Sequence, residues 1–337
     1  MHWGWIDVRR QRGTCRKYTY INYTRQQTLL VIEMAEEGEV RWGQQQRLEF
    51  VEWRAFWDGR VNRRDLEERF RISTPQASAD FARYQQVTNE NNIAYDQTEK
   101  TYVTKADFRP KFMRLSPERY LAQLEALTVE AIEKEDTWFA ELPPVDGVRR
   151  MARGPEAFVL RAIVDAIRRR QSIEVFYQSL SSTGNRVICP HALAHDGYRW
   201  HVRALSQEHG EFRDYVLGRI GSFSSPAPCD ADPRDDAEWN TFCTLELVAH
   251  PDLNEDQRKA IEHDFRIDGG TLRLPMRLAL VYYFIRRNNL DLRNGEIPPD
   301  RAQLYLQNYD AVVRACEEAK AEGRELVAKR RLKSKEK

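Results

Sequence analysis

Two stretches decide the fold: GYRWHVRA at residues 197–204 and FRDYVLGRI at residues 212–220. Apolar and polar side chains alternate in each, which predicts strands with two different faces. In the first, Arg199, His201 and Arg203 form the polar face; in the second, Arg213 and Arg219 lie together. Forked guanidinium donors match phosphate or carboxylate, so these arginines suit an anionic ligand. Outer arginines that are merely solvated are the alternative. The other face of the first strand carries Tyr198, Trp200, Val202 and Ala204.

This block resembles a WYL domain, the small Sm-like β-barrel sensor of bacterial transcriptional regulators. The triplet that names the family stands here as Trp200-His201-Val202, so only its tryptophan is kept. The family's later strand, which ends Leu-x-Arg-Ile, matches Leu217-Gly218-Arg219-Ile220. An upstream strand at Ile173–Ser179, followed by Cys189-Pro190-His191, stands where the family has its first strands.

From about residue 40 to about residue 293 the chain is most similar to the phage-defence-associated WYL regulators of the BrxR/CapW type. The resemblance implies an α+β multidomain fold with an N-terminal winged helix-turn-helix, a central Sm-like small β-barrel and a C-terminal α/β dimerisation extension. The domains we expect are an N-terminal extension of unknown role at 1–35, a winged helix-turn-helix at 36–106, a helical connector at 107–154, a WYL domain at 155–228, its extension at 236–296 and a helical, basic tail at 297–337.

Composition limits the other possibilities. With 53 Lys+Arg against 52 Asp+Glu the net charge is +1, so DNA binding must come from local basic faces. The five cysteines are far apart and form no CxxC pair, which argues against a zinc ribbon or a disulfide framework and favours reduced thiols in a cytoplasmic protein. No apolar run approaches the ~20 residues of a membrane span, and no signal peptide is recognisable.

The segment from residue 44 to residue 105 predicts a winged helix-turn-helix. Two short helices precede a third, for which Ser73 is a good N-cap. Strands follow at Ile93–Asp96 and Thr101–Thr104. In the third helix Ala77, Phe81 and Tyr84 share one face and should be buried, while the small opposite face can approach a major groove. A plain surface helix is the alternative. The residues we expect to contact DNA are Ser73, Thr74, Gln76, Ser78, Arg83 and Lys100.

The C-terminal part predicts a strand at residues 242–249, a helix capped by Asn254, a strand from Leu272 and a strongly apolar helix at 278–287. The resemblance implies that this part packs across a two-fold dimer axis; burial of the apolar helix within its own domain is the alternative. We expect the basic terminus at residues 329–335 to be disordered.

Catalytic motifs are absent: the sequence has no phosphate-binding GxxxxGK[ST] loop, no GxGxxG, no HExxH and no GxSxG. The His191-x-x-x-His195 spacing suits a metal only on a helix, whereas Pro190 and Gly197 favour loop and strand. We therefore expect no enzyme activity, metal or cofactor.

The expected function is that of a homodimeric repressor that binds an inverted-repeat operator in double-stranded DNA. The resemblance implies that it controls a phage-defence operon and is relieved by an anionic nucleotide or short nucleic acid at the WYL domain. A nucleic-acid-binding accessory module without promoter regulation and a metal-dependent nuclease are the alternatives. The candidate ligand-binding residues are Tyr177, Ser179, His191, His201, Arg203, Arg213 and Arg219.

Overall fold

The computed structural model describes residues 42–148, 151, 153–292 and 296–335. Its contacts divide these residues into two compact units, separated at residue 150, and each unit is described by itself. The predicted N-terminal extension at 1–35 lies outside the described residues. Within them no helix is long and apolar enough to cross a membrane.

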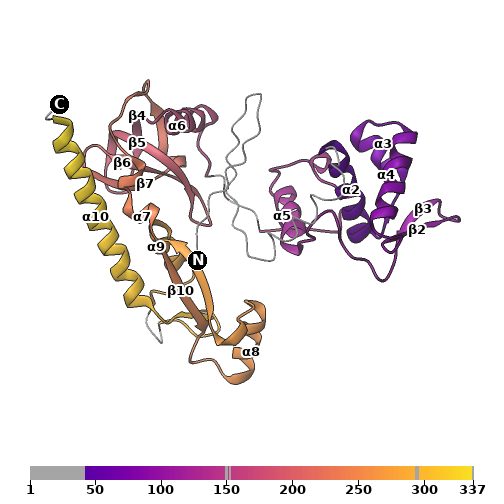
Figure 1. Ribbon diagram of the computed structural model, residues 1–337. Coiled ribbons are helices and arrows are strands. Elements are labelled where there is room, and N and C mark those ends of the chain that lie inside the picture. Colours follow the sequence, from indigo (N-terminus) through magenta and orange to yellow (C-terminus); the bar gives the residue numbers. More distant parts are fainter. Residues whose placement is uncertain (1–41, 149–150, 152, 293–295, 336–337) are drawn as a thin grey trace. The chain divides into compact units, whose positions relative to one another are not determined.

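The first unit contains the winged helix-turn-helix (Figure 1). Its three helices are α2 (Trp42–Asp58), α3 (Arg63–Phe70) and α4 (Thr74–Val87). The sheet has the order β1-β3-β2, with strands β1 (Arg60–Val61), β3 (Thr101–Thr104) and β2 (Ile93–Asp96). Both strands of the wing have the bounds expected from their alternation, and Asn62 is the residue that caps α3.

The core of this unit forms where α2, α3 and α4 turn their apolar faces together. Leu48 and Val51 of α2 meet Leu66 of α3, and all three are fully buried. The three helices bury their aromatic and aliphatic side chains against one another, and no single helix could bury this apolar surface by itself.

A second cluster fastens the connector to this unit. Trp53 is fully buried against Leu124 of α5 (Pro117–Thr128) and against Phe139, which follows the short 3₁₀ helix η1 (Lys134–Asp136). The ring centroids of Trp53 and Phe139 lie 5.9 Å apart in an edge-to-face arrangement. The connector up to Phe139 therefore shares the core of the DNA-binding unit.

A buried carboxylate holds the start of the connector. Glu52 of α2 accepts hydrogen bonds from the backbone N–H groups of Lys111 (2.7 Å), Phe112 (2.9 Å) and Met113 (2.8 Å). The Tyr84 hydroxyl donates a fourth bond to it, at 3.3 Å. Burial raises the pKa of Glu52, while these hydrogen bonds partly oppose the rise.

The second unit begins with α6 (Ala157–Arg169), whose inner side chains Val159, Ile163 and Ala166 pack against the sheet of the WYL domain. The antiparallel sheet has the order β7-β6-β5-β4-β8, and β9 also pairs with β4. Its strands are β4 (Gln171–Gln178), β5 (Thr183–His195), β6 (Trp200–Ser206), β7 (Glu211–Val216), β8 (Ile220–Phe223) and β9 (Ala227–Pro228).

Strands β7 and β8 lie at opposite ends of this order, joined by the 3₁₀ helix η2 (Leu217–Arg219). Within the described residues no pairing joins them, so the expected closed Sm-like barrel is not confirmed. The mixed helix and sheet content of the domain agrees with the prediction.

The extension that follows is built on the sheet β11-β10-β12. Apolar α9 packs on it, burying Leu278, Val281 and Ile285 in the core of the extension. At least this face of the helix is therefore buried within its own domain. The elements are η3 (Pro233–Asp235), α7 (Ala237–Asn240), β10 (Phe242–Ala249), α8 (Glu255–Asp264), η4 (Asp268–Gly270), β11 (Leu272–Arg277), α9 (Leu278–Arg287) and β12 (Leu304–Leu306).

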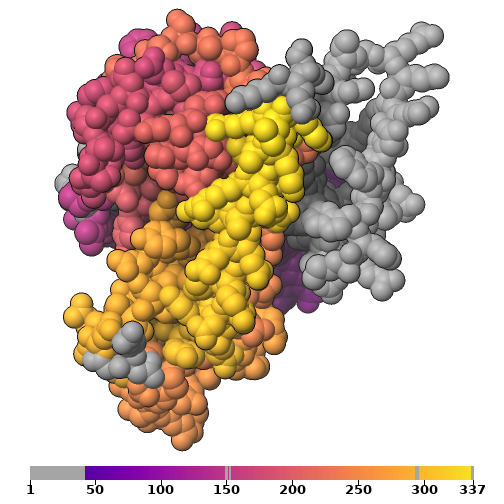
Figure 2. Space-filling view, turned by 90° about the vertical axis from the view of Figure 1, so that its left-hand side faces the viewer, coloured from indigo at the N-terminus to yellow at the C-terminus, as the bar shows by residue number. Residues whose placement is uncertain are grey.

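Helix α10 (Tyr309–Lys335) corrects the expectation of a disordered terminus. It runs along the second unit from the extension to the WYL domain (Figure 2). Val312 and Ala319 are buried in the core of the extension, and Val327 is buried against the WYL domain. Basic composition suggested disorder, but apolar residues spaced seven or eight apart give the helix a stripe to bury.

A disulfide joins Cys189 to Cys229. The expectation of reduced thiols is therefore wrong for these two residues, whereas Cys243 and Cys316 are free. A sequence separation of 40 between Cys189 and Cys229 hid the pairing, because β5 and the segment after β9 become neighbours only in the folded sheet.

Candidate nucleic-acid interface and sensor site

Helix α4 is fixed in place by an N-terminal cap and by the burial of its inner face. The Ser73 hydroxyl accepts a hydrogen bond from the Gln76 backbone at 3.5 Å, which begins the helix, and Pro75 lies in its first turn. Phe81 is fully buried and stacks on Tyr102 of β3, with ring centroids 4.3 Å apart. The predicted buried face, including Ala77 and Tyr84, is confirmed.

The opposite face of α4 is exposed and small at its centre, as expected. Ser78 lies beside it, and its hydroxyl accepts a bond from Arg63 at 3.4 Å. Arg83 donates to Gln86 at 3.0 Å, and the Gln76 side chain donates to Asp80 at 3.3 Å. The exposed residues of this face are Thr74, Pro75, Gln76, Ala79, Ala82 and Gln86.

Asp80 is a residue of this interface that the sequence pattern did not single out. Its carboxylate is fully buried and binds Arg47 Nε at 2.6 Å, with a further bond from Gln44 at 3.2 Å. The pair locks α4 onto α2, so the orientation of the outer face is set by charge as well as by packing. An acidic residue at an inward helical position was the only available signal.

Lys100 lies at the tip of the wing. It is exposed and has a φ of 54°, in the turn that joins β2 to β3. The Asp96 side chain accepts bonds from the backbones of Thr98 (2.7 Å) and Glu99 (3.0 Å), which fixes this turn. A cation on an ordered wing is suited to a phosphate contact.

Arg203 of β6 is the most constrained of the candidate sensor residues. Only 4% of its side chain is exposed. Its Nε and Nη2 atoms bind Asp236 at 2.8 and 2.9 Å, and Nη2 also binds Glu238 at 2.7 Å. Nη1 lies 3.5 Å from Asp214. Burial would lower the pKa of Arg203, but the three carboxylates outweigh burial and raise it.

The polar face of β6 is buried as well as the apolar face. His201 and Arg203 are buried, because α9 and the start of the extension cover them, whereas Trp200 is 52% exposed. Val202 and Ala204 are buried on the other side. The strand is therefore enclosed on both faces, and its polar side chains face partners supplied by a later part of the chain.

The two histidines contact different aspartates. His191 Nε2 lies 2.8 Å from Asp236, which it shares with Arg203. Burial would raise the pKa of Asp236, but hydrogen bonds from Arg203 and His191 hold it below its usual value.

His201 Nε2 lies 2.8 Å from Asp196, and its ring packs against Tyr283 of α9 with centroids 4.9 Å apart. Desolvation opposes ionisation of Asp196, yet bonds from His201 and from the backbones of Tyr198 and Arg199 lower its pKa to about 2.

The remaining candidates are dispersed. Tyr177 is buried, and its hydroxyl accepts a bond from the Val216 backbone at 3.1 Å. Ser179 bonds within its own turn. Arg213 pairs with Glu211, while Arg219 is half-buried without a side-chain partner among the described residues. The structure thus brings together His191 and Arg203, through Asp236, and does not gather all seven residues around one cavity.

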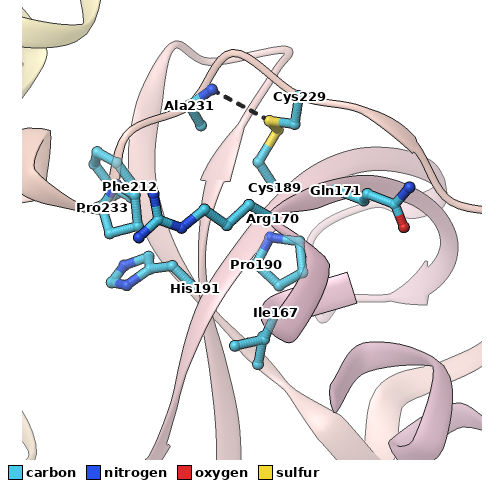
Figure 3. A pocket seen from close by; sticks show the side chains of 10 residues that line it. All are labelled: Ile167, Arg170, Gln171, Cys189, Pro190, His191, Phe212, Cys229, Ala231 and Pro233. Carbon is cyan, nitrogen blue, oxygen red and sulfur yellow. Dashed lines mark hydrogen bonds between the residues drawn. A yellow bond between two sulfur atoms is a disulfide. The ribbon is translucent and has the colours of Figure 1, made fainter. Parts of the chain in front are cut away.

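A pocket of about 240 Å³ lies next to His191 (Figure 3). Sequence reasoning missed Arg170, the αL C-cap of α6, whose side chain extends across this pocket. The disulfide lies in the pocket wall. Among the described residues no group of three or more His, Cys, Asp or Glu side chains could hold a metal ion.

The capped and exposed helix beside a wing, followed by a WYL-like sheet and an α/β extension, is the architecture of a winged-helix transcriptional regulator. Three family models match its parts: the BrxR winged helix-turn-helix domain at residues 43–126, the WYL domain at 159–224 and the BrxR C-terminal dimerization domain at 242–312.

Similarity to curated relatives defines the family of the chain more narrowly. The DNA-binding transcriptional repressor CapW of Escherichia coli strain KTE188 is 37% identical over 274 residues, covering 81% of this chain and 91% of its own. The CapW repressor of Pseudomonas aeruginosa is 39% identical over 275 residues, with the same two coverages. The CapW repressor of Stenotrophomonas maltophilia is 36% identical over 286 residues, covering 83% and 95%. The chain belongs to the BrxR/CapW family of WYL-domain transcriptional repressors.

Proposed function

We propose that this chain is a homodimeric repressor that inserts α4 into the major groove of an inverted-repeat operator and controls a phage-defence operon. The observation that carries the proposal is the outer face of α4: small at its centre, flanked by Gln76, Ser78 and Arg83, and held rigidly by the buried Arg47–Asp80 pair. Small residues permit close approach to the groove floor, and the flanking groups reach bases or phosphates.

The dimer is supported by the match of residues 242–312 to a dimerization domain. A two-fold dimer presents two copies of α4, which requires two half-sites related by inversion, about 10 bp or a multiple of it apart.

The proposal includes relief of repression by an anionic nucleotide or short nucleic acid at the WYL domain. Arg219, which has no side-chain partner among the described residues, is the candidate best placed to accept a new anion. Arg203 is already neutralised by three carboxylates, so an anion must displace one of them to bind it. A relieving ligand must bind the DNA-incompetent state more tightly.

The test is footprinting and gel-shift titration on the DNA upstream of the chain's own coding sequence, in the presence of non-specific competitor. We expect a protected inverted repeat for the wild type. Gln76→Ala and Arg83→Ala should bind it more weakly, while Arg64→Ala, a control on α3 with 82% side-chain exposure, should bind normally. Protection that does not depend on α4, or no specific protection at all, would reject the proposal.

A further inference from the structure

The Cys189–Cys229 disulfide lies where three parts of the second unit meet. Cys189 belongs to β5, and Cys229 comes directly after β9. Val327 of α10 is buried in the same small apolar cluster, together with Leu205 and Phe212. One covalent bond thus lies beneath the C-terminal helix, at the start of the segment that leads from the WYL domain into the extension.

This segment, residues 229–236, carries the acidic groups that hold its neighbours. Asp236 forms the two-bond pair with Arg203 of β6. Asp232 and Asp235 both bind Arg330 of α10, the former at 3.1 Å. Because the disulfide anchors the beginning of the segment to β5, it helps to fix the position from which these aspartates reach β6 and α10.

The disulfide can be reached from outside through the pocket of about 240 Å³, whose wall contains both sulfur-bearing residues (Figure 3). Cys229 is partly exposed, whereas Cys189 is buried. Arg170 extends across the same pocket, and its guanidinium has no hydrogen bond or ion pair with another described residue. The pocket therefore presents an electrophilic sulfur and an available cation within one small volume, which suits a small thiol that also carries a carboxylate.

Complete reduction of the disulfide consumes two such thiols. The thiolate of the first attacks Cys229 Sγ, the Cys189–Cys229 bond breaks, and Cys189 leaves as a thiolate that takes up a proton. Gln207 Nε2 lies 3.1 Å from Cys189 Sγ and can donate to the departing thiolate. A second thiol resolves the mixed disulfide, which yields two protein thiols and one oxidised small-molecule disulfide. Two electrons and two protons pass to the protein.

We propose that Cys189–Cys229 is a redox-sensitive latch: small carboxylate-bearing thiols reach it through the Arg170 pocket, and its reduction loosens residues 229–236 and helix α10 from the WYL domain. The proposal goes beyond the repressor function, and its test does not require DNA binding.

The test uses the full chain, oxidised and reduced, with peptide mapping under non-reducing conditions to identify the 189–229 bond. Hydrogen exchange is then measured on peptides covering residues 324–333 of α10, with α8 as an internal reference. We expect exchange at least about tenfold faster in the reduced wild type and in Cys229→Ser than in the oxidised wild type. Cys243→Ser, which alters a free cysteine of the extension, should match the oxidised wild type.

A second measurement tests access through the pocket. Reduction by glutathione, which carries carboxylates, should be several-fold slower in Arg170→Ala than in the wild type, whereas reduction by neutral mercaptoethanol should proceed at the same rate. The latch is overturned if no 189–229 linked peptide forms even after treatment with oxidised glutathione, or if α10 exchanges equally in both redox states. Equal glutathione rates with and without Arg170 would overturn the pocket as the route.

Discussion

Replacing Arg203 by alanine should destabilise the second unit strongly. The side chain donates two hydrogen bonds to Asp236 and one to Glu238, and it also faces Asp214. Asp236 is 1% exposed, so after the substitution its charge would be left with His191 as its remaining side-chain partner. Removing one partner of a buried ion pair costs about 3–5 kcal/mol, mostly from the carboxylates left behind.

The matched control is Arg213→Ala on the neighbouring strand β7. Arg213 is 44% exposed, and its partner Glu211 keeps a second ion pair to Arg324 at 2.7 Å. The loss should therefore be no more than about 1 kcal/mol. Arg203→Lys should fall between the two, because a single ammonium cannot reproduce the forked geometry.

Urea unfolding monitored by hydrogen exchange on β6 and β10 peptides reports the second unit separately from the first. A loss below about 1 kcal/mol for Arg203→Ala would refute the argument, since it would mean that the three carboxylates do not depend on this cation.

Four further outcomes are expected. Gln76→Ala should weaken operator binding by about 1–3 kcal/mol with little effect on non-specific DNA, whereas Arg83→Ala should weaken both and reduce the salt dependence of the gel-shift affinity. Glu52→Leu should lower the free energy of unfolding of the first unit by about 2–4 kcal/mol in urea melts, because it leaves three backbone N–H groups unpaired. Asp196 stabilises the fold at pH values above its ordinary pKa of 3.8, and this stabilisation is lost as the pH falls toward about 2. In an acid titration of the free energy of unfolding, Asp196→Asn should therefore lack the loss of stability that the wild type shows in this pH range. The same dependence of stability on pH in both proteins would contradict the assignment. Light scattering at micromolar concentration should give the mass of a dimer, and a monomer with and without DNA would exclude the two-fold operator model.

The DNA-binding unit was largely predictable because its signals are local. A hydroxyl cap at Ser73, apolar residues at helical spacing and two alternating strands around a polar turn each depend on residues within one or two turns of one another. The bounds of both wing strands and the buried face of α4 follow from them.

The candidate site around Arg203 was not predictable in the same way. Alternation along β6 correctly separated its two faces but assigned the polar one to the outside. The partner that buries Arg203 is Asp236, 33 residues further along, at the start of the predicted C-terminal extension. Likewise the disulfide joins cysteines whose proximity arises only when β5 and the end of β9 meet. Periodicity describes one element at a time and carries no information about which distant element will cover it.

The aromatic cluster around Trp53 has a practical consequence for dissecting the chain. A fragment that stops after the wing, near residue 106, would leave Trp53 and Trp57 without Tyr120, Phe139 and the backbone partners of Glu52. The truncation would expose the two indole rings to water. It would also leave the carboxylate of Glu52 without its backbone hydrogen-bond donors in a partly apolar environment. The smallest stable DNA-binding fragment should therefore extend to about residue 140, where the Ala140 backbone donates to Asp58 at 3.3 Å. Such a fragment would keep the buried partners of Trp53, Trp57 and Glu52 and could be tested for DNA binding without the second unit.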